Sequence, residues 1–260
     1  MINLTVIAIT LDEEEMLPSF IENVQKLTSN ILIVDSFSND RTKSICLSAG
    51  VNFIENKFEG FGNQWNFAIN HELVRTDWVI KLDPDERLTS ELIQSIQKFI
   101  MAPEYYKGAY FNRVLYFNNK NTGVEQKVVR LWKNGYCKFS NVVVNEHPVI
   151  NGEIKRLKGI LHHLDDTNIN EWFKKQLLYS DLEAESILKD HQLSFEPRIF
   201  GSADQRRMYL KKVFFKVPFR YMIYRTYLIT VNFKNVFKPG FIHWVDSREM
   251  VLKMIEFKIK

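Results

Sequence analysis

The chain lacks most features that mark secreted or membrane-spanning proteins. Cys46 and Cys137 are the only cysteines in 260 residues, which argues against a disulfide framework and favours a reducing compartment. No run of about 18 uninterrupted apolar residues occurs, so a membrane-spanning helix is not expected. The first apolar run meets the acidic residues 12–15 without a preceding basic segment, so no signal peptide is expected.

The composition is that of an ordinary globular protein, but its charge is unevenly distributed. Hydrophobic residues make up 45% of the chain and charged residues 25%, a balance far from that of disordered chains. Residues 206–260 contain 13 Lys and Arg against 3 Asp and Glu, a net charge of +10, whereas residues 1–205 contain 22 against 28, a net charge of −6. This division predicts two parts with different roles.

The first part of the chain alternates short apolar runs with helical patterns. This alternation indicates an α/β fold, with a mostly parallel central sheet and helices on both faces. Ligands bind such sheets at the carboxyl ends of the strands, where Asp35 and Asp83 are expected to lie. The expected strands are residues 4–10, 31–34, 51–54 and 78–82, and the expected helices end near residues 27, 49, 73 and 100, the last one being capped by Thr89.

The later part is first rich in β-like runs and then helical. A long amphipathic helix is expected over residues 169–189. We therefore expect a catalytic domain over residues 1–204 and a helical, basic and aromatic segment over residues 205–260. The β-like runs in this part are residues 109–117, 127–132, 141–144 and 157–161.

Asp83-Pro84-Asp85-Glu86 is the most informative local sequence. Two carboxylates flank a proline that fixes the turn directly after an apolar strand. One or two carboxylates can hold Mg²⁺ or Mn²⁺, and such a cation neutralises the charge of a pyrophosphate so that it can leave. An acidic turn that only caps the next helix is the alternative, because an Asp-x-Asp pair alone is common.

This turn is the last of four sequence motifs that follow one another along the chain. The motifs are Ile9–Glu14, Val34–Thr42, Phe58–Ala68 and Asp77–Arg87. Together they resemble the family-2 inverting glycosyltransferases of GT-A fold, and most closely the lipopolysaccharide core β-1,4-glucosyltransferases. A weaker likeness continues to about residue 185. The resemblance implies a GT-A fold and a metal-dependent transfer of a sugar from a nucleoside diphosphate to an acceptor.

The same resemblance implies roles for individual residues. Asp85 would be the direct metal ligand, and Asp83 a ribose or water-mediated partner of the metal site. The residues that would line or border the donor pocket are Thr10, Asp35, Gln64 and Asn66. The structural alternatives are a capping threonine for Thr10, a strand-end aspartate for Asp35 and helix-surface amides for the other two.

Phe37 departs from the family pattern. The chain has Ser36-Phe37-Ser38 where relatives usually carry Ser-Gly-Ser. Because phenylalanine adopts a left-handed turn less readily than glycine, we expect this loop to differ in shape.

Two further candidates follow later β-like runs. The resemblance implies that Glu146 is the general base, which takes the proton of the acceptor hydroxyl. Its neighbour is Asn145, where relatives have His. For Glu146 the alternative is a solvated residue at a strand end.

A histidine of the next β-like run is a candidate for an additional metal ligand, because neutral imidazole binds divalent cations. Neighbouring side chains on a strand face opposite ways, so at most one of His162 and His163 points inward. His162 is the better match, with an incidental pair of histidines as the alternative. Arg130 is a candidate for phosphate or acceptor contact, with a surface position as the alternative.

The C-terminal segment interleaves cations with aromatic residues, as in Lys211–Tyr221 and Tyr224–Lys238. Basic residues gain about 1 kcal/mol each near anionic lipid, and aromatic rings settle at the interface. We therefore expect a cytoplasmic protein, peripheral on the inner face of the membrane, beside a saccharide or lipid-linked acceptor. Packing of the aromatics on the catalytic domain is the alternative, and no nucleic acid is expected because no binding motif occurs.

The predicted function is an inverting transfer of a sugar in cell-envelope polysaccharide or lipopolysaccharide core synthesis. UDP-glucose is the first choice of donor, from the resemblance alone. A nucleotidyltransferase is one rival, but it would usually carry a Gly-rich basic loop where this chain has the acidic residues 12–15. A non-catalytic membrane-associated adaptor with the same fold is the other, and it would tolerate Asp85→Ala.

Overall fold

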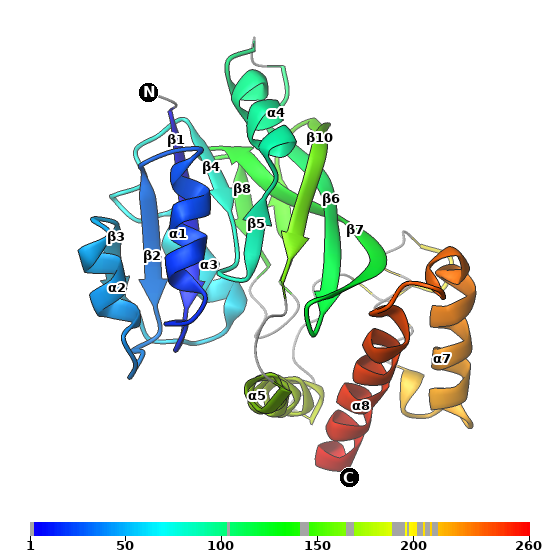
Figure 1. The fold of residues 1–260 in the computed structure, drawn as a ribbon. Helices are drawn as coiled ribbons and strands as arrows, with labels where there is room; N and C mark the ends of the chain where they lie inside the picture. The colour runs from blue at the N-terminus through cyan, green and yellow to red at the C-terminus, as the bar shows by residue number, and fades with distance from the viewer. Residues whose placement is uncertain are drawn as a thin grey trace. The chain divides into compact units, whose positions relative to one another are not determined.

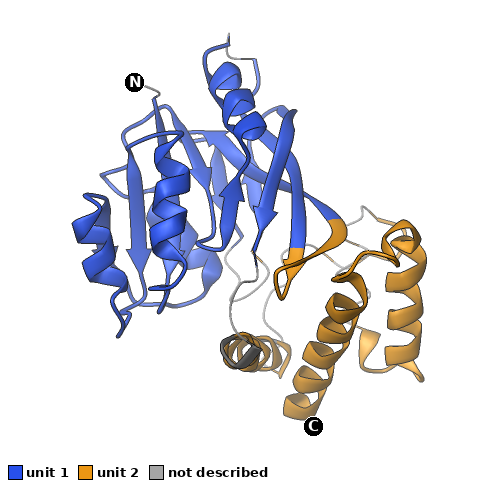
Figure 2. Cartoon of the chain, in the orientation of Figure 1, with its two compact units in different colours: residues 1–115, 125–140, 148–164 blue, residues 116–124, 141–147, 165–260 orange. Residues whose placement is uncertain are grey.

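The computed structural model describes residues 3–102, 105–140, 146–164, 169–188 and 213–260, together with residues 196, 198–201, 205 and 209 (Figure 1). The chain forms two compact units (Figure 2). Unit 1 comprises residues 1–115, 125–140 and 148–164, and unit 2 comprises residues 116–124, 141–147 and 165–260. The predicted boundary between residues 204 and 205 stays a prediction.

Unit 1 is built on an eight-stranded sheet. Its strands are β1 (Leu4–Thr10), β2 (Ile31–Asp35), β3 (Asn52–Glu55), β4 (Trp78–Lys81), β5 (Glu86–Leu88), β6 (Gly108–Phe117), β7 (Lys120–Lys133) and β10 (Ile154–His163). Their order is β3-β2-β1-β4-β7-β6-β10-β5. The half formed by β3, β2, β1 and β4 is parallel, whereas β7 is antiparallel to β4. β10 is parallel to β6 and antiparallel to β5.

Helices cover both faces of this sheet, as Figure 1 shows. They are α1 (Leu17–Gln25), α2 (Thr42–Ser48), α3 (Phe61–Ile69) and α4 (Ser90–Ile100). Successive side chains of a strand point to opposite faces, and therefore Val6 and Ala8 of β1 share one core with residues of α1, α2 and α4. Ile7, between them, belongs to a second core that includes Trp65 of α3. The α/β architecture expected from the sequence is confirmed.

The element boundaries agree with the sequence pattern where the signal is local. Thr89 caps α4 as expected, because its side chain accepts a hydrogen bond from the Leu92 N–H. Helix α3 ends at Ile69 rather than near Leu73. The pattern does not predict β5, or the pair β8 (Cys137–Phe139) and β9 (Pro148–Ile150), because strands of three residues are too short to show a period. The expected strand over residues 141–144 lies outside the described residues.

Gly159 in β10 lies so close to α4 that no side chain fits there. Its φ is +92°, and a Cβ would lie 2.4 Å from the Leu92 nitrogen, whereas Gly50, with a φ of +68°, has nothing within 4 Å. We expect Gly159→Ala to lower the free energy of unfolding by roughly 2–5 kcal/mol, from backbone strain and overpacking together. Gly50→Ala should cost only about 1 kcal/mol, from strain alone. Urea unfolding measures both variants, and equal losses would contradict this packing.

The described residues of unit 2 are mainly helical. Helices α5 (Ile169–Leu188) and α7 (Arg220–Val231) both pack on α8 (Phe241–Ile259), and a short 3-10 helix, η1 (Phe233–Asn235), follows α7. The helical C-terminal segment expected from the sequence is confirmed. Across the described part of the chain, none of the helices combines the length and hydropathy needed to cross a bilayer.

Candidate active site

A buried carboxylate joins the carboxyl ends of β1 and β2. Asp35 is fully buried, and its Oδ1 accepts hydrogen bonds from Thr10 Oγ1 at 2.7 Å and from Ser38 Oγ at 2.6 Å. The Ser38 N–H donates to Asp35 Oδ2 at 2.7 Å. These bonds satisfy a carboxylate that is otherwise costly to bury, and they fix the loop that follows β2. Thr10 and Asp35 thus lie together, and their predicted contact with the donor stays a prediction.

Phe37 in this loop adopts the left-handed conformation in spite of its side chain. Its φ is +63°, its side chain is exposed, and Asp12 has a φ of +52°. The Asp12 N–H donates to Ser38 Oγ, and the Asn39 N–H donates to Asp12 Oδ1, each at 2.8 Å. These bonds hold both residues in a conformation that costs about 1–2 kcal/mol each. The turn that the sequence disfavours at this position is therefore present, and the surrounding hydrogen bonds stabilise it.

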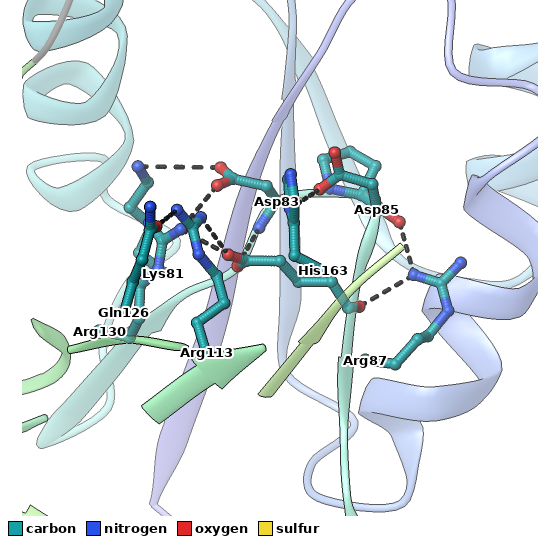
Figure 3. Close-up of polar contacts among 10 residues, drawn as sticks. Lys81, Asp83, Asp85, Arg87, Arg113, Gln126, Arg130 and His163 are labelled. Atoms are coloured by element: carbon teal, nitrogen blue, oxygen red, sulfur yellow. Dashed lines mark hydrogen bonds and ion pairs between the residues drawn. The ribbon is translucent and has the colours of Figure 1, made fainter. Parts of the chain in front are cut away.

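The turn after β4 is fixed by its own residues, as Figure 3 shows. The Glu86 N–H donates to the Asp83 carbonyl at 2.9 Å, and the Asp83 N–H donates to Glu86 Oε2 at 3.0 Å. Arg87 donates to the Pro84 carbonyl at 2.6 Å. The Glu86 side chain is fully buried, whereas those of Asp83 and Asp85 keep 29% and 32% of their exposure. This acidic turn, residues 83–86, thus buries one carboxylate as an anchor and presents the other two.

Three cations from neighbouring strands gather around the acidic turn (Figure 3). Arg130 Nη2 lies 2.8 Å from Asp83 Oδ2 and 2.6 Å from Glu86 Oε1. Arg113 Nη1 lies 3.0 Å from the same Glu86 oxygen, and Lys81 Nζ lies 3.8 Å from Asp83 Oδ1. Burial alone would raise the pKa of the Asp83 carboxyl, but Lys81 and Arg130 outweigh burial and hold that pKa well below its ordinary value. Asp83 is therefore ionised and held in one place.

His163, rather than His162, lies against the acidic turn. Its Nδ1 is 3.3 Å from Asp85 Oδ1, and the next residue, Leu164, donates its N–H to the Asp85 carbonyl at 2.8 Å. Burial lowers the pKa of His163, but the Asp85 carboxylate outweighs burial and raises that pKa above its ordinary value. Burial lowers the pKa of His162. The ring beside Asp85 is thus not the one predicted as a metal ligand, and a metal contact by His162 stays a prediction.

The acidic turn fits a hard divalent cation that shares its ligands with a bound phosphate. Among the described residues, no group of three or more His, Cys, Asp and Glu side chains is placed to hold a metal ion, so Asp83 and Asp85 would act without a complete protein shell. Mg²⁺ typically takes one or two carboxylates together with phosphate oxygens and water. Lys81 and Arg130 beside Asp83 are always cationic near neutral pH, whereas His163 beside Asp85 can release its proton, so Asp85 is the stronger candidate ligand.

Gln64 and Asn66 project from α3 and bind other parts of unit 1. Gln64 is fully buried, its Oε1 accepts from Asn56 Nδ2 at 2.7 Å, and its Nε2 donates to Ser36 Oγ at 3.2 Å. Asn66 donates to the Phe139 carbonyl at 3.0 Å and accepts from the Phe139 N–H at 2.9 Å. Gln64 therefore ties the loop after β2 to α3, and Asn66 ties β8 to α3. Their predicted place at the border of the donor pocket stays a prediction.

Glu146, the predicted general base, is described in unit 2, whereas the acidic turn belongs to unit 1. The Glu146 side chain is half-buried, and its neighbour Asn145 lies outside the described residues. Its role in catalysis stays a prediction that rests on the sequence.

A model of a known protein family matches about the first two thirds of the chain. The family model described as glycosyl transferase family 2 matches residues 5–181, which is more than half of the chain and includes the acidic turn.

The chain belongs to glycosyltransferase family 2.

The relatives of this family-2 chain include bacterial proteins of greater length. An uncharacterized glycosyltransferase of Rickettsia typhi is 26% identical over 196 residues, which cover 70% of this chain and 66% of the relative. One of Rickettsia prowazekii has the same identity and coverage. The family-2 chain thus spans just under two thirds of the length of these relatives.

Solved structures support the fold of this family-2 chain. The crystal structure of S. aureus TarS 1-349 is similar over 100% of this chain and 90% of that chain, with a TM-score of 0.52 and 13% identity. At this identity the likeness shows the fold alone, and it agrees with the GT-A architecture. Glucosyl-3-phosphoglycerate synthase from Mycobacterium tuberculosis, solved with Mg²⁺ and uridine diphosphate, is similar over 42% of this chain and 43% of that chain at a TM-score of 0.37 and 16% identity, which is too little to carry an argument.

Four residues of this family-2 site escape prediction from the sequence: Lys81, Glu86, Arg113 and His163. Glu86 carries a weak signal, because it follows Asp85 directly in an acidic run. Arg113 carries none, since its partner Glu86 is 27 positions away. His163 could not be chosen over His162, because the choice depends on the pairing of β10 with β5, where His163 lies opposite Glu86.

Proposed function

We propose that this chain transfers a sugar from a nucleoside-diphosphate sugar to an acceptor hydroxyl, with inversion at the anomeric carbon. The acidic turn at the carboxyl end of β4 carries this proposal, because it combines an ionised, anchored Asp83 with a partly exposed Asp85. Membership of glycosyltransferase family 2 supports the class of reaction. A carboxylate pair in this position matches the need to neutralise a departing diphosphate.

Residues of the acidic turn and its neighbours would stabilise the diphosphate as it leaves the sugar. Mg²⁺ or Mn²⁺ bound by Asp85, with Asp83 as a ribose or water-mediated partner, would supply the positive charge that lets the diphosphate depart. Lys81 and Arg130 keep Asp83 ionised and prevent its side chain from turning away. Glu86, which is buried beneath them, fixes the turn that carries both aspartates.

The nucleotide itself would bind at the carboxyl ends of β1 and β2. Asp35 fixes the loop after β2 through Thr10 and Ser38, and Gln64 holds the same loop through Ser36. This edge is therefore ordered before a donor arrives, which reduces the entropic cost of binding. The proposed contacts of Thr10, Asp35, Gln64 and Asn66 with the donor rest on the family resemblance.

Glu146 is the proposed general base on the acceptor side. We expect Glu146→Gln to lower kcat by roughly 10²–10⁴-fold, because glutamine cannot take the acceptor proton, while the affinity for the donor nucleotide stays unchanged. Steady-state kinetics and isothermal titration calorimetry measure the two quantities separately. Glu153→Gln, at an exposed position of unit 1, is the matched control and should keep full activity. A Glu146→Gln enzyme with normal kcat would exclude this residue as the base.

The donor and the acceptor are further proposals from the same resemblance. We propose UDP-glucose as the donor and a saccharide or lipid-linked acceptor of cell-envelope polysaccharide or lipopolysaccharide core synthesis, reached from the cytoplasmic side. Thermal unfolding with UDP-, GDP- and CMP-sugars, each with and without Mn²⁺, tests the donor, and UDP-glucose should give the largest metal-dependent rise in Tm. If no nucleotide sugar stabilises the protein in a metal-dependent way, the non-catalytic adaptor becomes the better account.

A further inference from the structure

Helix α7 in unit 2 exposes one largely apolar side to solvent, while Leu228 on another side is buried. Along one side of the helix, pairs of exposed residues recur every four positions, which places them on a single face. The apolar members are between 51% and 63% exposed. The residues of this face are Met222, Ile223, Thr226, Tyr227, Thr230 and Val231.

The charged residues of α7 are held by another helix. The helix contains only two, Arg220 and Arg225, and both pair with acids of α8. Arg220 pairs with Glu256, and Arg225 Nη1 lies 2.6 Å from Asp246 Oδ1. An ordinary surface helix covers its solvent side with charged residues, whereas the six exposed residues of α7 include no charged one. A contiguous exposed face of this kind marks a site of interaction with a protein or a membrane.

Exposed aromatic rings and lysines flank α7 along the chain. Phe219 precedes the helix, and Phe233 and Phe237 follow it, with exposures of 77%, 69% and 91%. Exposed lysines alternate with these rings along the chain. They are Lys216, Lys234 and Lys238, and no Asp or Glu occurs between Asp204 and Asp246.

We propose that this surface, the α7 face with residues 216, 219, 233, 234, 237 and 238, docks on an anionic lipid bilayer. Apolar side chains and aromatic rings enter the headgroup region of a bilayer, while lysine stems lie along it and their ammonium groups meet lipid phosphates. Each such lysine strengthens binding about fivefold. The proposal rests on unit 2 alone and is independent of the proposed sugar transfer.

A second copy of this chain is a less suitable occupant of the same surface. In a twofold-symmetric contact the same patch meets itself. Two segments that each carry a net charge of +10 over residues 206–260 would then be brought together, and like charges across an interface oppose association. An anionic bilayer satisfies both the apolar face and the lysines.

Flotation of the full chain with lipid vesicles tests the proposal. The unsubstituted chain should float with vesicles of phosphatidylcholine and phosphatidylglycerol, and it should float far less with phosphatidylcholine alone. The variant Ile223→Ser, Tyr227→Ser, Val231→Ser should remain in the bottom fraction, with an unchanged circular dichroism spectrum and Tm because these side chains are exposed. The variant Lys234→Glu, Lys238→Glu should bind the anionic vesicles at least about 25-fold more weakly.

Matched substitutions on unit 1 serve as controls. Leu47→Ser, Met101→Ser, Tyr105→Ser removes two aliphatic side chains and one tyrosine that are 61%, 83% and 70% exposed, and Lys155→Glu, Lys158→Glu reverses two exposed lysines. Both controls should float as the unsubstituted chain does. Undiminished flotation of the α7 variant would overturn the proposal. So would a dimer, seen by analytical ultracentrifugation without lipid, that the α7 variant dissociates.

Discussion

Replacing Asp85 with asparagine is expected to lower the rate of sugar transfer by roughly 10³-fold or more, because the variant loses the carboxylate that would hold the divalent cation against the leaving diphosphate. The Asp85 side chain keeps 32% of its exposure, so the free energy of unfolding should change by only about 1 kcal/mol or less. Initial rates of nucleoside diphosphate release, with acceptor and Mn²⁺ present, measure the effect.

Asp77→Asn is the matched control for this variant. Asp77 lies directly before the amino end of β4 and is exposed, and its carboxylate accepts a hydrogen bond from Asn3 Nδ2. The same substitution at the opposite end of the strand should leave the transfer rate unchanged. An Asp85→Asn enzyme that transfers sugar as fast as the Asp77→Asn enzyme would remove Asp85 from the reaction.

Replacing Glu86 with glutamine is expected to produce a large loss of stability, of roughly 3–5 kcal/mol, because it removes the buried charge that neutralises Arg113 and, together with Asp83, Arg130. The Glu86 carboxylate is fully buried and binds Arg130 at 2.6 Å and Arg113 at 3.0 Å. Its second oxygen accepts the Asp83 N–H. Glutamine has only one acceptor oxygen, so it cannot accept from both this N–H and the arginines. Urea unfolding monitored by circular dichroism measures the difference in the free energy of unfolding.

Glu72→Gln provides the comparison for this loss. Glu72 is exposed, and replacement of a surface carboxylate usually changes stability by no more than about 0.5 kcal/mol. Equal stabilities of the Glu86→Gln and Glu72→Gln variants would show that the buried charge cluster does not stabilise the fold.

Much of unit 1 follows from local features of the sequence. The continuous apolar runs of β1, β2 and β4 show that these strands are buried on both faces. The acids that follow or end them, such as Asp35 and Asp83, therefore fall at the carboxyl edge, where the structure places them. Thr89 was recognisable as a helix cap because capping depends on residues only three positions apart.

The remaining features depend on contacts that the local sequence does not encode. Arg130 reaches Glu86 across 44 positions, and no periodicity signals such a pairing. The choice between His162 and His163 depends on strand register, and a slip of one residue reverses which side chain faces the turn. The sequence also does not show which side of α7 faces solvent, because that depends on the pairing of Arg225 with Asp246 of α8.

The central claim is that the acidic turn around Pro84 binds a divalent cation together with a nucleoside diphosphate. Isothermal titration of UDP into the unsubstituted chain, in Mn²⁺ and in EDTA, and into Asp85→Asn in Mn²⁺, tests this claim most directly. UDP should bind in Mn²⁺, and roughly tenfold or more weakly both in EDTA and to the Asp85→Asn variant. Equal affinities under all three conditions, or no binding of UDP in Mn²⁺, would contradict the claim.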